Sequence, residues 1–199
     1  MANVPTVHSA APRVPRAGLL VLAAVFAVAV LAGIAFSVLR SGGADQSRPV
    51  PDHALAGSHD MTKAFAELAQ RSGVDAALPA APRGLTLWAV ALEPGAPGAA
   101  AGNLVLDYYA GAKPPKELTD LAGYAGPRVQ VIYRPGAAVP AGTESAVIAG
   151  REVAVQRAES GAVYYIPSGG LLVEVRSWST GSQPAPGDDD LAPLFGSLK

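Results

Sequence analysis

The chain has 199 residues, a formal net charge of −1 and no cysteine. The lack of cysteine excludes disulfides, thiol catalysis and thiolate metal sites in this sequence. Because acidic and basic residues are balanced and no basic block occurs, the composition predicts that nucleic acid is not a partner. Half of the residues are apolar, which is enough to build a hydrophobic core.

Residues 17–39 form an apolar stretch without a charged side chain, flanked by Arg16 and Arg40. A helix of this length extends about 34 Å and can cross a bilayer core of about 30 Å. We expect a single transmembrane helix; a signal peptide cleaved near residues 42–44 is the alternative. Positive charges are nearly equal on the two sides, and a long domain after a first helix is commonly exported. Residues 1–16 are therefore predicted to be cytoplasmic.

Residues 40–57 are polar and rich in glycine and proline, and this composition predicts a flexible tether. Residues 58–199 are predicted to form one extracytoplasmic α+β domain. Its first element is a helix that begins after Asp60 as N-cap and ends near Gly73. Its apolar side chains recur at helical spacing and predict one buried stripe, made of Met61, Ala64, Phe65 and Leu68.

Strand signals follow in the ranges 84–94, 103–111 and 128–136, where apolar and polar residues alternate. Four more strands are predicted at 144–150, 151–158, 162–167 and 171–178, joined by glycine-containing turns. Such close neighbours favour an antiparallel meander over parallel strands with crossovers. In the range 103–109 the alternation places Asp107 and Tyr109 on the face opposite Tyr108.

The chain closes with a second helix whose apolar residues again share one face: Leu191, Leu194, Phe195 and Leu198. Pro193 is tolerated in the first turn, so Asp190 or Asp189 is the predicted N-cap. The predicted fold is an antiparallel sheet of about six strands, with the N-terminal and C-terminal helices on one face and a single transmembrane helix ahead of the domain.

The order of these signals resembles a family of uncharacterised bacterial domains. Its pattern is a Leu-Pro opening before a strand, a strand ending in aromatics, and a strand with paired aromatics before a glycine turn. Here these are "LPAAPRGLTLWAV", "LVLDYY" and "VYYIPSGGLLVEV", and the chain closes on "LAPLFGSLK". The family is found as the extracytoplasmic part of membrane-bound anti-sigma factors and related envelope proteins. The resemblance implies an envelope location, but residues 1–16 are too few to clamp a sigma factor.

Residues that carry chemistry are sparse. The histidines His8, His53 and His59 lie outside the strands, and "DHALAGSHD" at 52–60 is better explained as linker than as a metal site. Acidic residues 188–190 are better explained by helix capping than by calcium binding. No catalytic, cofactor-binding or metal-binding residue is therefore predicted, and no cofactor is expected.

Two features of the strand faces remain open. Asp107 and Glu174 lie at outward positions with Arg134 and Arg176, which predicts cross-strand salt pairs. The aromatic residues that an open sheet face would use to line a shallow ligand groove are Trp88, Tyr109 and Trp178.

These observations predict a membrane-anchored, extracytoplasmic binding or sensing module without catalysis. Its partners would be the membrane and an unidentified envelope protein or ligand. Two alternatives remain: a cell-envelope hydrolase or transferase that uses surface carboxylates, and a regulator related to anti-sigma factors that lacks the sigma-binding domain.

Overall fold

The computed structural model describes residues 51–95, 102–111, 113–121 and 123–198. They belong to a compact unit, Pro49–Lys199. The predicted cytoplasmic residues 1–16 and the apolar segment 17–39 lie outside the described residues. Among the described residues, no helix has both the length and the apolar character needed to span a membrane. The predicted fold class included a transmembrane helix, and this part is corrected, because the described helices include no membrane-spanning one.

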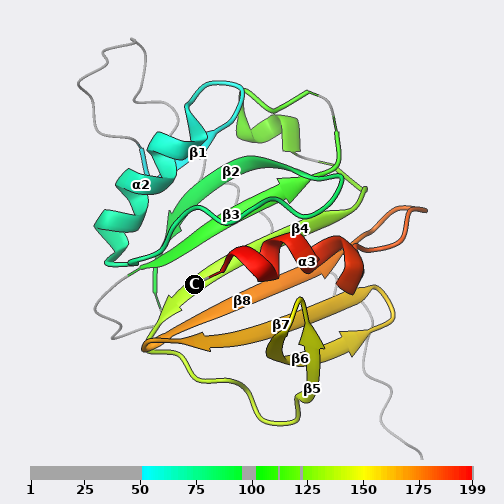
Figure 1. The fold of residues 1–199 in the computed structure, drawn as a ribbon. Helices are drawn as coiled ribbons and strands as arrows, with labels where there is room; N and C mark the ends of the chain where they lie inside the picture. The colour runs from blue at the N-terminus through cyan, green and yellow to red at the C-terminus, as the bar shows by residue number, and fades with distance from the viewer. Residues whose placement is uncertain (1–50, 96–101, 112, 122, 199) are drawn as a thin grey trace, which may run out of the picture. The chain divides into compact units, whose positions relative to one another are not determined.

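The described domain contains one antiparallel sheet of eight strands, so the prediction of about six strands is wrong (Figure 1). The strands are β1 (His53–Leu55), β2 (Thr86–Glu93), β3 (Asn103–Tyr109), β4 (Arg128–Pro135), β5 (Glu144–Ile148), β6 (Arg151–Ala158), β7 (Gly161–Ser168) and β8 (Leu171–Trp178). Strand β1 falls within the residues from which a tether was predicted. It is too short to show an alternating pattern and is defined by its pairing with β2.

The strand order is β1-β2-β3-β4-β8-β7-β6-β5. Two meanders, β1 to β4 and β5 to β8, therefore meet where β4 pairs with β8. This arrangement agrees with the predicted antiparallel meander, and it brings the last strand to the middle of the sheet. Positions far apart in the sequence consequently share rows across β3, β4 and β8.

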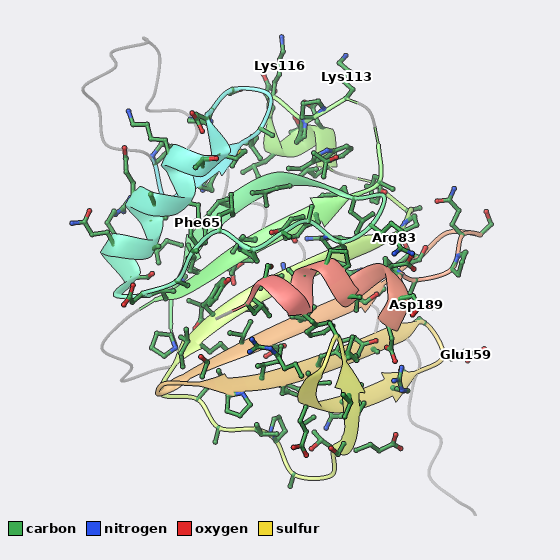
Figure 2. The ribbon with its side chains drawn as sticks, viewed as in Figure 1. Phe65, Arg83, Lys113, Lys116, Glu159 and Asp189 are labelled. Carbon is green, nitrogen blue, oxygen red and sulfur yellow. The ribbon has the colours of Figure 1, made fainter. Side chains whose placement is uncertain are left out.

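Two helices, α2 (Met61–Ser72) and α3 (Asp188–Ser197), lie on the same side of the sheet in Figure 1, and a short 3-10 helix, η1 (Leu118–Leu121), lies at its periphery. Figure 2 shows Phe65 on the side of α2 that faces the sheet. Phe65 and Phe195 join one buried cluster with side chains of β2 to β8. The core therefore lies between the helices and one face of the sheet, as predicted.

The caps of the two helices differ in how well the sequence predicts them. Asp60 accepts hydrogen bonds from the backbone N–H groups of Thr62 and Lys63, and Gly73 ends α2 in a left-handed conformation, as predicted. The predicted N-cap of α3 is wrong. The helix begins two to three residues earlier, with Gly187 as N-cap, and the Asp190 carboxylate accepts from the Gly187 N–H at 3.0 Å.

Pro193 consequently lies inside α3, beyond the first turn, where it removes one helical hydrogen bond. Leu191, Leu194 and Phe195 are nevertheless fully buried. Packing of this apolar stripe on the sheet therefore outweighs the missing bond.

The face of the sheet opposite the helices is called here the polar face; its residues include Asp107, Tyr109, Arg128, Gln130, Arg134, Tyr165, Glu174, Arg176 and Trp178. The register places them in rows across β3, β4, β8 and β7. Their neighbours along the strands, such as Tyr108, Val129 and Val175, belong to the core cluster under the helices. The predicted alternation of the strands is thus confirmed.

Candidate functional site

Three aromatic side chains form a cluster where β2 and β3 lie side by side, next to the loop that precedes β4. Trp88 stacks on Tyr109, with ring centroids 5.0 Å apart and planes 19° apart. Tyr124, from the loop before β4, meets Tyr109 edge-on at 4.9 Å and Trp88 at 5.9 Å. Offset stacks and edge-to-face pairs are the favoured aromatic geometries. The three rings therefore form a rigid wall where β2 and β3 meet.

A β-bulge places Trp88 in this wall. The register of β2 against β3 shifts between Leu87 and Ala89, so Trp88 is the extra residue. A bulge redirects the side chain that it adds, and here the indole lies beside Tyr109 rather than under the helices. Gly111 makes this close approach possible, because a Cβ there would come within 2.7 Å of the Trp88 ring.

The Tyr124 hydroxyl fixes the loops around the cluster. It lies 2.8 Å from the carbonyl oxygen of Ala110 and 3.0 Å from that of Pro127, and it accepts from the Ala110 N–H at 3.0 Å. One phenol thus connects the end of β3 to the start of β4. Burial raises the pKa of the Tyr109 hydroxyl well above its ordinary value, and the nearby Asp107 charge adds to this. Tyr109 is therefore neutral at physiological pH.

Arg128 extends the cluster across the polar face. Its guanidinium carbon lies 4.8 Å from the centre of the Tyr109 ring and 4.7 Å from that of Trp178. Arg128 also forms an ion pair with Asp107, Nη2 to Oδ1, at 2.8 Å. Gln130 donates to the same oxygen at 3.1 Å. Cation–π and charge-assisted contacts thus hold this arginine in one orientation.

A second group of charges lies further along the polar face. Glu174, only 6% exposed, pairs with Arg134 at 2.8 Å and with Arg176 at 2.5 Å. Glu93 is the last residue of β2 and is exposed. The atoms packed around its carboxyl raise its pKa, and Asp107 adds to the rise while Arg176 opposes it.

A shallow recess of about 550 Å³ adjoins the aromatic cluster at the end of the sheet. Its wall consists of Tyr124 and of small or neutral residues from three loops: Ala110, Gly111, Ala125, Gly126, Gly181, Ser182 and Gln183. Gly181 approaches the chain so closely that a Cβ would lie 2.4 Å from the Ala125 carbonyl oxygen. Among the described residues no charged side chain lines the recess, so it suits a neutral polar group better than a phosphate or a metal ion.

The aromatic cluster also retains a hydrogen-bond donor. The indole Nε1 of Trp88 is buried and has no hydrogen-bond partner within the described part of the chain. Buried polar atoms are usually paired. Trp88 does not line the recess and its Nε1 is enclosed, so this donor belongs to the interior of the aromatic cluster.

The structure brings together the aromatic residues that the sequence indicated. Trp88 and Tyr109 are in contact, and Trp178 lies on the other side of Arg128. The recess, however, is lined by Tyr124, which sequence reasoning did not select. The glycines around Tyr124 are the signal that could have identified it, because "GYAG" at 123–126 combines an aromatic residue with positions that allow close backbone approach.

The predicted cross-strand salt pair is confirmed for Glu174 with Arg134. Arg176 also pairs with Glu174, but it lies two residues along the same strand. Asp107 pairs instead with Arg128, its neighbour on β4. His53 lies in β1, and the ring of His59 lies beside the backbone of Leu55. Among the described residues no group of three or more acidic or histidine side chains is arranged to hold a metal ion, and His8 lies outside them.

The acidic residues 188–190 begin α3. Asp188 accepts hydrogen bonds from Arg157 at 2.8 Å and from the Tyr164 hydroxyl at 2.6 Å. The Arg157 hydrogen bond lowers the pKa of Asp188, although partial burial opposes it. Asp188 and Asp190, which accepts from the Gly187 N–H, thus have structural partners.

Comparison of the chain with protein-family models, with curated proteins and with solved structures found no match. The resemblance to the extracytoplasmic domain of anti-sigma factors therefore stays a prediction.

Proposed function

We propose that this domain is a non-catalytic binding module, and that its ligand or partner protein binds at the recess beside Tyr124. The observation that carries the proposal is the combination of a rigid aromatic wall with a neutral recess of about 550 Å³. This volume is within the range of ligand pockets, about 300–1,000 Å³. Neutral side chains such as Ser182 and Gln183 offer hydroxyl and amide groups for hydrogen bonds.

The carboxylates of the polar face support binding more than catalysis. Glu174 is held by two arginines and Asp107 by Arg128 and Gln130. A general acid in a glycosidase-like site has a raised pKa in an apolar setting, whereas an arginine partner stabilises the charged form. The hydrolase or transferase alternative would have to combine Glu93, whose carboxyl has a raised pKa, with carboxylates that already have cationic partners. The envelope location stays a prediction.

Site-specific photo-crosslinking tests the proposal in the full-length chain inside the cells that produce it. A photoreactive residue at Ser182, in the recess, is expected to give a discrete adduct. The same residue at Ala138, an exposed position in the loop after β4 at the opposite end of the strands, serves as the control and should give none.

Filling the recess provides the second arm of this experiment. Ala125 lines the recess and is exposed, so Ala125→Phe adds bulk there without entering the core. It should remove the Ser182 adduct, whereas Ala77→Phe, at an exposed alanine in the loop after α2, should leave it. Equal adducts at Ser182 and Ala138, or an adduct that survives Ala125→Phe, would contradict the proposed site.

A further inference from the structure

The two edge strands of the sheet, β1 and β5, differ in whether their outer backbone groups have hydrogen-bond partners. At the β1 edge, the Leu55 N–H donates to His59 Nδ1 at 3.3 Å. The Leu55 carbonyl accepts from the N–H groups of Ser58 and His59, each at 2.9 Å. The three-residue strand β1 therefore leaves little backbone free for another strand. Natural sheets commonly protect their edges by short strands and covering segments of this kind.

The β5 edge lacks such protection. Ala149 and Gly150 form a two-residue turn between β5 and β6, with φ of 51° and 77°. In such a hairpin the flanking pair, Ile148 and Arg151, is hydrogen-bonded, and bonded and non-bonded pairs then alternate. The backbone groups of Ser145 and Val147 consequently point away from β6.

Nothing in the described part of the chain accepts or donates to these outward groups. The backbone bonds outside the ladders involve neither Ser145 nor Val147. Val147 is also 73% exposed and is the large apolar side chain that stands out at the surface of the described residues. The strand itself, "ESAVI", carries neither lysine nor proline, the residues that most often block edge pairing.

The exposed edge is complementary to itself. Consider an antiparallel pair of two β5 strands centred on Ala146. Ser145 of each copy then lies opposite Val147 of the other copy. Both are outward residues, so the two pairs form four backbone hydrogen bonds. Glu144 faces the apolar Ile148 of the second copy, and no like charges are opposed. The small Ala146 side chains at the centre allow the strands to approach.

We propose that β5 is a self-association edge, at which two copies of this chain join their sheets through antiparallel β5–β5 pairing with Ala146 at the two-fold axis. This surface is separate from the recess beside Tyr124. A five-residue edge buries less than a standard protein–protein interface. The dimer is therefore weak and forms at high local concentration of the chain.

Engineered disulfides test the register, because the native chain has no cysteine. At the two-fold axis, Ala146 forms a non-hydrogen-bonded pair with Cα atoms about 4.5 Å apart, a separation that a disulfide spans. Ala146→Cys in the full chain should therefore give dimers under mild oxidation. Ser145→Cys places the two thiols on diagonal positions about 7–8 Å apart, and Glu159→Cys lies on a remote turn. Both should give several-fold less dimer.

Substitution of Val147 in the Ala146→Cys chain distinguishes pairing from random collision. Val147→Pro removes an N–H that points away from β6, and proline is tolerated at such edge positions. It should lower the dimer yield several-fold, whereas Val147→Thr, which keeps the N–H, should not. Tryptophan fluorescence verifies that each variant is folded. Equal yields from Ala146→Cys and Glu159→Cys, a yield insensitive to Val147→Pro, or crosslinks only to other proteins would overturn the proposal.

Discussion

Truncation of Phe195 tests whether α3 depends on its packing against the sheet. The Phe195 side chain is 0% exposed and meets the Tyr164 ring edge-on, with centroids 5.3 Å apart. The helix has ten residues and contains Pro193 and Gly196, so it has little intrinsic stability. Phe195→Ala should lower the free energy of unfolding by about 3–5 kcal/mol. Of this, about 0.5–1.5 kcal/mol is the aromatic pair, and Phe195→Leu should lose roughly that part.

Urea unfolding followed by tryptophan fluorescence measures this loss in the full chain, because both tryptophans, Trp88 and Trp178, lie in the sheet. With a slope of about 2 kcal/mol/M, the midpoint should fall by roughly 1.5–2.5 M. Asp189→Ala, at the exposed start of the same helix (Figure 2), should cost less than about 1 kcal/mol. If Phe195→Ala unfolds at the midpoint of the parent, α3 does not stabilise the sheet and the reasoning is refuted.

Three further variants test local interactions by the same urea assay. Asp60→Ala should cost about 0.5–2 kcal/mol as a lost N-cap, and an unchanged midpoint would contradict the cap. Tyr124→Phe should cost about 1–3 kcal/mol, because it removes the hydroxyl that bonds the Ala110 carbonyl and leaves the Ala110 N–H and the Pro127 carbonyl with only their 3.4 Å bond to each other; a smaller loss would mean that water replaces the hydroxyl. Asp188 has a lowered pKa in the folded protein, so its contribution is present above about pH 4 and is lost as the pH falls through the folded value. The midpoint difference between the parent and Asp188→Asn should therefore be seen at pH 7 and shrink near pH 3, and a constant difference would refute this.

The elements that the sequence predicts well are those that a local pattern defines. Alternation along 103–109 and 128–135 assigns each side chain to a face without knowledge of its partner strand. The Asp60 cap and the Gly73 end of α2 are likewise recognised within a few residues. The stripe of Phe195 and its neighbours predicts burial of α3 on the sheet because only tertiary packing can stabilise so short a helix.

The features that the sequence did not predict depend on pairing between distant segments. Strand β1 exists because residues 53–55 pair with β2, and three residues carry no period. The bulge at Trp88 is a mismatch between two strands, so neither strand shows it alone. The start of α3 was misplaced because Pro193 was assumed to need the first turn, whereas the fold tolerates it further along. The contact of Arg128 with both Tyr109 and Trp178 requires that β4 lie between β3 and β8.

The one-sided arrangement of the domain separates stability from recognition. Both described α-helices cover the same face, so the carboxylates of the polar face are neutralised by arginines of the sheet itself, as Glu174 is by Arg134 on β4 and Arg176 on β8. Those side chains are already paired with each other, so they contribute little to ligand specificity. The recess beside Tyr124, by contrast, is bounded by loops held in place at the end of the sheet. Loops on a rigid scaffold can change their surface without changing the core, and specificity for a partner is therefore best sought there.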